Sequence, residues 1–390
     1  MKLLKNPIFW IVILVGGLIV IGYKVMVKTA EQQEALRHKE KEQVFTLKKY
    51  DLFGVAAIRP ATVLAVGSNG MLLQSPDKGD TWEERQIGSP EQVFSAICFP
   101  DDKNGWIVGT GGMILHTEDG GKNWKQVEIE GGSYLRDVFF IDADNGWIVG
   151  EDCTILRTAD GGKTWDLIET DLFLITLTAV EFFDKNRGWS VGEQGTVMFS
   201  SDGGRTWKEQ NIGKKREIEK LTLGDDSQKY FGGSGASYDD NYKAYSELEL
   251  KPTLMSLTIV DENTVMVAGL GGALFITKDG GDTWKKNPVK TGTGKGYIEN
   301  HVFKIFEHEL IERRKDYNTF YMVCRGAQYY SFDNMRSFRP VSPAEELKVL
   351  IKRGWFYDMT SHPVLKSSLW MVGKWGIILE LKGHDWLRIH

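Results

Sequence analysis

The residues of this sequence whose types and spacing could do chemistry are aspartates in glycine-rich turns. Residues 142–146 (DADNG) resemble the start of a calcium-binding loop, in which carboxylate oxygens hold the cation. Such a loop needs a bidentate glutamate at its twelfth position, where Cys153 stands here. The related turns DDKNG and DKNRG show that the stretch repeats along the chain, and the seven histidines form no H-x-x-x-H pair. We therefore expect a hairpin turn at each of these places, and we assign no metal site.

A second kind of aspartate recurs in the pattern Ser/Thr-x-Asp-x-Gly-x-x-Trp. An aspartate in a hairpin can accept hydrogen bonds from the N–H groups of its own turn, and the glycine can adopt positive φ. The tryptophan can bury its ring between neighbouring structural units. This chemistry is structural and needs no substrate. The pattern occurs at residues 75–82, 117–124, 158–165, 200–207 and 277–284, with aspartates Asp77, Asp119, Asp160, Asp202 and Asp279 and tryptophans Trp82, Trp124, Trp165, Trp207 and Trp284.

The spacing of these motifs indicates a repeat fold. Two degenerate copies, at 331–338 and 380–386, bring the aromatic positions to 82, 124, 165, 207, 284, 338 and 386. A period near 42 residues is the length of one four-stranded propeller blade. Alternating apolar runs, a turn ending in Gly-Trp and a glycine-rich hairpin supply the strands within each period. We predict an all-β, seven-bladed β-propeller, with an insertion at about 212–252 between blades four and five.

The beginning of the chain predicts a membrane anchor. No charged residue stands between Lys5 and Lys24, and the apolar span continues to residue 27, long enough to cross the hydrocarbon layer as a helix. A cleaved signal peptide is the alternative. We expect a short cytoplasmic N-terminus at 1–6, a transmembrane helix at 7–27, a charged spacer at 28–45 and the propeller at 46–390, facing the periplasm of a bacterium from its inner membrane.

The motifs also carry a resemblance to known families. The Ser/Thr-x-Asp-x-Gly-x-x-Trp spacing is that of the Asp box of the bacterial neuraminidase repeat. The fuller pattern, with GWIVG ahead of T-x-D-G-G-x-x-W, resembles the photosystem II assembly and stability factor family and its relatives in non-photosynthetic bacteria. The resemblance covers about residues 50–390 and is strongest over 90–210. It implies a seven-bladed propeller, an extracytoplasmic location, no catalysis and a role as chaperone or scaffold for membrane-protein complexes.

Hydrolysis of a glycoside is the enzymatic alternative. It requires a carboxylate pair, or a tyrosine nucleophile with acidic partners, and arginines that grip an acidic sugar. The Arg-Ile-Pro signature of sialidases is scrambled here to Ile58-Arg59-Pro60. We assign no catalytic residue and no cofactor, and we expect no small-molecule substrate. A net charge of −5 over 390 residues argues against a nucleic-acid partner.

A binding face can be placed on the predicted propeller. One edge carries the Asp-box turns, and the other carries the glycine-rich hairpins and the connections between blades. Basic and aromatic residues at that second edge would suit an acidic partner segment, although a solvated rim is the alternative. The candidate residues for partner binding are Arg136, His301, Arg325, Arg353, Lys374 and Trp375.

These observations predict a non-enzymatic assembly factor, scaffold or accessory subunit of an integral membrane protein complex on the periplasmic side, such as an exporter or a respiratory complex. A propeller that binds glycan or envelope polymer is the second interpretation, and a sialidase-like hydrolase is the third. Either residues 44–49 or the last segment, DWLRIH, could supply the outer strand that closes blade seven.

Overall fold

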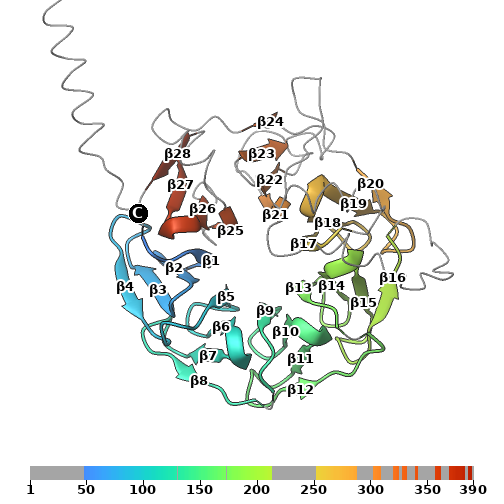
Figure 1. Cartoon of the computed structure of the whole chain (residues 1–390), viewed down its shortest axis with the longest axis horizontal. Helices are drawn as coiled ribbons and strands as arrows, with labels where there is room; N and C mark the ends of the chain where they lie inside the picture. The colour runs from blue at the N-terminus through green and yellow to red at the C-terminus, as the bar shows by residue number, and fades with distance from the viewer. Residues whose placement is uncertain are drawn as a thin grey trace, which may run out of the picture. The chain divides into compact units, whose positions relative to one another are not determined.

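The computed structural model describes residues 48–390 apart from 130, 173, 213–251, 288–301, 309–318, 325–326, 332–338, 341–355, 362–368, 383–384 and 389–390. The strands form seven antiparallel four-stranded sheets, each built from four consecutive strands in the order of the chain. Lys48–His390 is one compact unit, and within it the sheets stand around a ring as the blades of a propeller (Figure 1). Side-chain packing is described for six of the sheets, and blade six is described by its backbone.

The strands of the first four blades follow the predicted repeat. Blade one holds β1 (Leu52–Ile58), β2 (Thr62–Gly67), β3 (Met71–Ser75) and β4 (Glu83–Gln86). Blade two holds β5 (Phe94–Cys98), β6 (Gly105–Gly109), β7 (Ile114–Thr117) and β8 (Lys125–Gln126). Blade three holds β9 (Leu135–Phe140), β10 (Gly146–Gly150), β11 (Ile155–Thr158) and β12 (Asp166–Leu167). Blade four holds β13 (Leu177–Phe182), β14 (Gly188–Gly192), β15 (Val197–Ser200) and β16 (Lys208–Gln210).

The last three blades keep the same order although their sequence motifs weaken. Blade five holds β17 (Leu254–Ile259), β18 (Val265–Gly269), β19 (Ala273–Thr277) and β20 (Lys285–Lys286). Blade six holds β21 (Val302–His308), β22 (Thr319–Cys324), β23 (Ala327–Ser331) and β24 (Arg339–Pro340). Blade seven holds β25 (Phe356–Ser361), β26 (Leu369–Gly373), β27 (Ile378–Lys382) and β28 (Asp385–Arg388).

The predicted fold class placed a transmembrane helix ahead of the propeller, and the described residues do not show one. No helix in the described part of the chain is long and apolar enough to cross a membrane. The helices that interrupt the blades there are three-residue 3₁₀ turns: η2 (Thr110–Gly112), η3 (Glu151–Cys153), η4 (Glu193–Gly195), η5 (Leu270–Gly272) and η7 (Lys374–Gly376). The segments 1–6, 7–27 and 28–45 lie outside the described residues, as does most of the predicted insertion at 212–252.

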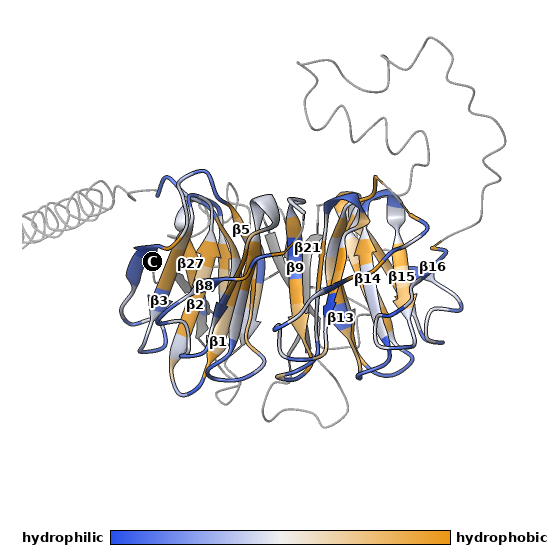
Figure 2. Ribbon diagram, turned by 90° about the horizontal axis from the view of Figure 1, so that it is seen from below, coloured by the Kyte–Doolittle hydropathy of each residue, from blue (hydrophilic) through white to orange (hydrophobic). Residues whose placement is uncertain are grey.

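The core lies between the blades. All five residues of each GWIVG-type second strand, such as β6 and β10, are buried, because neighbouring blades cover both of their faces. One cluster joins Ile58 and Leu64 of blade one to Ile107 of blade two, and comparable clusters fill the following seams. Figure 2 shows the apolar strands running through the body of the ring and polar residues at both edges. The repeat therefore stabilises itself by stacking one blade on the next.

The ring closes between blade seven and blade one without sharing a strand. The C-terminal β28 is the outer strand of blade seven, paired with β27, so this candidate supplies the strand. Leu52 and Val55 of blade one pack with Val372 of blade seven. The N–H of Val55 donates to Oδ2 of Asp358 at 3.0 Å, and the N–H of Lys48 donates to the carbonyl of Trp375 at 3.2 Å. Packing and these cross-seam hydrogen bonds take the place of a mixed sheet.

Candidate functional site

The ring has two edges with different residues. We call "turn edge" the side that carries the Asp-box turns and the turns before each Gly-Trp, and "hairpin edge" the side that carries the η turns and the connections between blades. At the turn edge the two kinds of turn meet within a blade: the N–H of Gly161 donates to the carbonyl of Asp144 at 2.9 Å. The same contact recurs in blades two, four and five through Gly120, Gly203 and Gly280.

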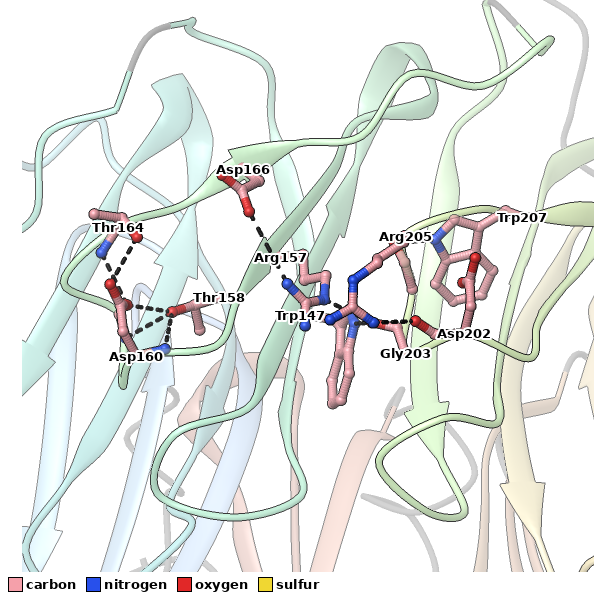
Figure 3. Close-up of polar contacts among 12 residues, drawn as sticks. Trp147, Arg157, Thr158, Asp160, Thr164, Asp166, Asp202, Gly203, Arg205 and Trp207 are labelled. Atoms are coloured by element: carbon pink, nitrogen blue, oxygen red, sulfur yellow. Dashed lines mark hydrogen bonds and ion pairs between the residues drawn. The ribbon is translucent and has the colours of Figure 1, made fainter.

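The Asp-box carboxylates are occupied by their own turns. In blade three, Asp160 accepts hydrogen bonds from the hydroxyl of Thr164 at 2.7 Å, the N–H of Thr164 at 3.0 Å and the hydroxyl of Thr158 at 2.9 Å (Figure 3). These bonds, the Thr164 hydroxyl first, lower the pKa of Asp160 to about 2. Asp77, Asp119, Asp202 and Asp279 accept equivalent hydrogen bonds. A carboxylate held in this way serves its turn and is not poised to react.

The Asp-box tryptophans lie at the seams but keep part of their rings exposed in blades one to four. Trp124 packs against the cluster between blades one and two, and its Nε1 donates to the carbonyl of Gly121 at 3.0 Å. Trp82 and Trp207 make the same bond to the glycine three residues earlier, and Trp284 donates to Oε1 of Gln210. The rings that are almost fully enclosed belong instead to the second strands of the blades: Trp106, Trp147 and Trp189 of the Gly-Trp pairs, and Trp370, which follows Leu369.

A set of polar side chains that sequence reasoning missed joins blades one, three and four to the Asp box of the next blade. Arg85 donates to the carbonyl of Lys122 at 2.7 Å, and Arg157 donates through Nε to the carbonyl of Gly203 at 2.7 Å (Figure 3). Gln210 donates to the carbonyl of Gly280 at 3.2 Å. Arg157 is a charged residue that follows Ile155 and Leu156 in the short strand β11, and a charge in such a strand is the signal that could have identified it.

The metal interpretation of residues 142–146 finds no support in the geometry. The Asp142 carboxylate accepts the N–H of Asp144 at 2.9 Å and of Asn145 at 2.8 Å, and it pairs with Nζ of Lys185 at 2.7 Å. Partial burial raises the pKa of Asp142, but the hydrogen bonds from Lys185 and Asn145 outweigh it and hold the pKa far below its usual range. Within the described ranges, no group of three or more acidic, histidine or cysteine side chains could hold a metal ion.

At the hairpin edge, the structure describes three of the six candidate binding residues. Arg136, in β9, donates from Nη2 to Oε1 of Glu151 at 2.7 Å, and its guanidinium lies 3.8 Å from the ring centroid of Tyr134. Its charge is therefore neutralised within blade three, which the sequence did not indicate. Lys374 and Trp375 lie in η7 of blade seven, with the ammonium 5.1 Å from the indole centroid. His301, Arg325 and Arg353 lie outside the described residues.

Trp375 occupies an unusual backbone position. It sits at the tip of the inner hairpin with φ of 62°, in the left-handed region. The equivalent tips in the other described hairpins are residues that tolerate this region better: Asn69, Gly111, Asp152, Gln194 and Gly271. Its N–H donates to Oδ1 of Asp51 at 2.8 Å, and its ring is half-buried. Beside this hairpin, at the start of β1 and β25, the rings of Phe53 and Tyr357 meet with centroids 4.9 Å apart.

Comparison with known proteins finds a family match in the first part of the chain. Residues 34–133 and 123–173 match the family described as photosynthesis system II assembly factor YCF48, which confirms the predicted resemblance over blades one to three. No curated protein matches the chain.

Solved structures share the fold at low identity. YCF48 from Cyanidioschyzon merolae is 17% identical, with a TM-score of 0.60 over 86% of this chain and 96% of that chain. YCF48 bound to a D1 peptide is 16% identical, with a TM-score of 0.59 over 86% and 92%. A catalytically inactive virginiamycin B lyase from Staphylococcus aureus with quinupristin is 10% identical, with a TM-score of 0.62 over 87% and 97%. At these identities the likeness establishes the propeller fold alone.

Proposed function

We propose that this chain, whose residues 34–173 match the photosystem II assembly factor family, is a non-enzymatic assembly factor or scaffold that binds a segment of an integral membrane protein at its hairpin edge. The observation that carries this proposal is Trp375. A bulky side chain in the left-handed region costs roughly 1–2 kcal/mol relative to ordinary backbone. Backbone strain of this kind is concentrated at functional sites, and tryptophan is enriched among the residues that dominate protein interfaces.

The surroundings of Trp375 suit a peptide. Lys374 supplies a positive charge beside the indole, and the aromatic pair of Phe53 and Tyr357 belongs to the same pair of adjoining blades. A segment with an apolar side chain next to a carboxylate would match this combination. YCF48 has been solved with a D1 peptide, which is a precedent for a family member that binds a segment of another protein.

The proposal extends to where the protein works. We propose that residues 7–27 anchor the chain in the bacterial inner membrane, with the propeller in the periplasm. The compact unit that forms the propeller begins at Lys48, whose N–H donates a hydrogen bond to the carbonyl of Trp375 at the hairpin edge. A tether that enters beside the proposed binding residue would raise the effective concentration of a membrane client at that site. The client would then be a membrane complex assembled in the same bilayer.

The test is a mild-detergent pull-down of the full-length protein from native membranes, followed by mass spectrometry. We expect one stoichiometric membrane complex, retained by the wild type and lost in Trp375→Ala. Leu167→Ala is the matched control, because Leu167 is an apolar residue 65% exposed on the outer strand β12, away from the hairpin edge. A variant lacking residues 1–28 should recover less of the complex. Equal recovery by wild type and Trp375→Ala would contradict the assigned site, and recovery of envelope glycan alone would replace the scaffold function with glycan binding.

A further inference from the structure

A pair of arginines at the turn edge distinguishes the seam between blades three and four from the other seams whose side chains are described. Arg157 of blade three is only 8% exposed, and its Nε donates to the carbonyl of Gly203 in the Asp box of blade four. The same carbonyl accepts Nε1 of Trp147 at 3.1 Å. Arg205 follows in that Asp box, and its Nη1 donates to the carbonyl of Asp202 at 2.7 Å. The two guanidinium groups therefore bond adjacent carbonyls, of Gly203 and of Asp202, in one Asp-box turn (Figure 3).

The terminal nitrogens of Arg157 are left without a close partner. Its nearest carboxylate oxygen belongs to Asp166, 4.0 Å from Nη1, which is too far for a hydrogen bond, and the Asp166 side chain is 72% exposed. The enclosed polar atoms that lack a hydrogen-bond partner include none from Arg157. Its Nη groups therefore reach the surface from a side chain that is otherwise buried. A buried guanidinium normally has its donors satisfied, because the charge is costly to remove from water.

The second arginine makes the local charge more positive. Burial lowers the pKa of Arg157, and the nearby charge of Arg205 lowers it further, against the opposing effect of Asp166 and Asp202. Arg205 is pinned by its bond to a backbone carbonyl, so it does not swing freely away from Arg157. Two like charges held at one turn favour an anion that bridges them.

This combination occurs at one described seam only. The residues at the position of Arg157 in the other blades are Gln74, His116, Phe199, Ile276, Tyr330 and Glu380. The residues at the position of Arg205 in the other Asp boxes are Asp80, Lys122, Lys163 and Asp282. The seams after blades one, two and four are closed by one arginine, by the edge-on rings of Trp106 and Trp165, and by one glutamine, so the fold itself does not require two arginines.

We propose that Arg157 and Arg205 form an oxyanion-binding site at the turn edge between blades three and four, which takes a phosphate or carboxylate group. Arg157 supplies terminal N–H donors from a fixed, buried position, and Arg205 closes the site from the solvent side. Guanidinium groups bind both kinds of oxyanion through paired N–H donors. The site is on the opposite edge from Trp375, so its test does not depend on the proposed partner-binding function.

The experiment is calorimetric titration of the full-length chain in detergent, in Tris chloride at constant ionic strength, with inorganic phosphate in one arm and acetate in the other. We expect saturable binding of at least one anion, weakened at least tenfold in Arg205→Gln. Lys163→Gln is the matched control, because it removes the charge at the same Asp-box position one blade earlier; its affinity should equal that of the wild type. Because Arg205 is exposed, its substitution should leave the fold intact, and an unchanged thermal unfolding curve would verify this.

The two arms separate the sources of the anion. Binding of phosphate alone assigns the site to a phosphate-bearing ligand, and binding of acetate assigns it to a carboxylate such as an acidic side chain of a partner. Weakening by Arg205→Gln and not by Lys163→Gln supports the site in either case. No binding would overturn the proposal. Binding that both variants retain equally would indicate an adventitious ion only and would overturn it as well.

Discussion

The turn edge and the hairpin edge of this propeller use similar residues to different effect. At the turn edge, the polar groups of the Asp boxes are bonded to their own turns, and left-handed backbone is assigned mostly to glycine. At the hairpin edge, left-handed positions include Asp152, Cys153 and Trp375, and exposed polar tips project from the ring. The first edge is therefore built for stability, and the second accepts strain. The difference teaches that a repeat can conserve its fold on one side while varying its surface on the other.

The largest effect should come from Gly162→Ala at the turn edge. A Cβ there would lie 2.0 Å from Cη2 of Trp106, a ring enclosed between blades two and three, and the glycine has φ of 75°. Overpacking and a strained backbone together should lower the free energy of unfolding by about 2–5 kcal/mol. Gly111→Ala is the matched control at the hairpin edge, because it has φ of 68° and open space around its Cβ; it should cost roughly 1–2 kcal/mol. Chemical denaturation measures both, and equal losses would break the comparison.

The second-largest decrease in the free energy of unfolding is expected from the loss of an Asp-box carboxylate. Asp160→Asn should lower stability at neutral pH by about 1–2 kcal/mol, because the charged acceptor of the Thr164 and Thr158 bonds is gone. The pKa of Asp160 is about 2 in the folded protein and near 3.8 when unperturbed, so its contribution is present above pH 4 and is lost as pH falls toward 2. The difference between wild type and variant should shrink over that window. Asp282→Asn, at an exposed position, serves as the control, and a pH-independent difference would argue against the assigned role.

Trp375→Gly should change stability less than either substitution at the turn edge. Glycine relieves the left-handed strain, while the half-buried indole loses its packing, and the two effects oppose each other. We expect a net change of less than about 1 kcal/mol in the free energy of unfolding. Denaturation should show this small change in the same preparation whose pull-down shows loss of the membrane complex. A loss of several kcal/mol would mean that Trp375 serves the fold and not a partner.

The smallest effect belongs to the ion pair at the hairpin edge. Glu151→Gln should lower stability by about 0–1 kcal/mol, because the Arg136 and Glu151 side chains are 35% and 40% exposed and solvent screens them. The effect should diminish further at high salt. A double-mutant cycle with Arg136→Gln isolates the pair. A coupling well above 1 kcal/mol would show that this edge is also built for stability.

Much of the fold followed from local sequence. The five Asp boxes, the Gly-Trp pairs and a period near 42 residues predicted four-stranded blades, because each motif is satisfied within one turn or one hairpin. Blades six and seven were located by degenerate copies alone, and their sheets are nevertheless complete in the strands described. The predicted anchor at 7–27 stays a prediction.

The candidate site was predicted less completely, for a physical reason. Arg136 looked like a free donor in the sequence, but it faces Glu151, which is 15 residues away along the chain. The set of Arg85, Arg157 and Gln210 was missed because each of these side chains bonds a carbonyl of the next blade, and no local pattern records which carbonyl a strand residue will meet.

The sequence by itself thus determined the repeat, the turns and the identity of the residues that satisfy them, because those interactions close within a few residues. Tertiary structure decided what lies across each seam. It paired Arg157 with the Asp box of blade four, placed Lys48 against Trp375 where the ring closes, and neutralised Arg136. Contacts between blades depend on the stacking of whole sheets, and stacking brings together side chains that the chain itself keeps apart.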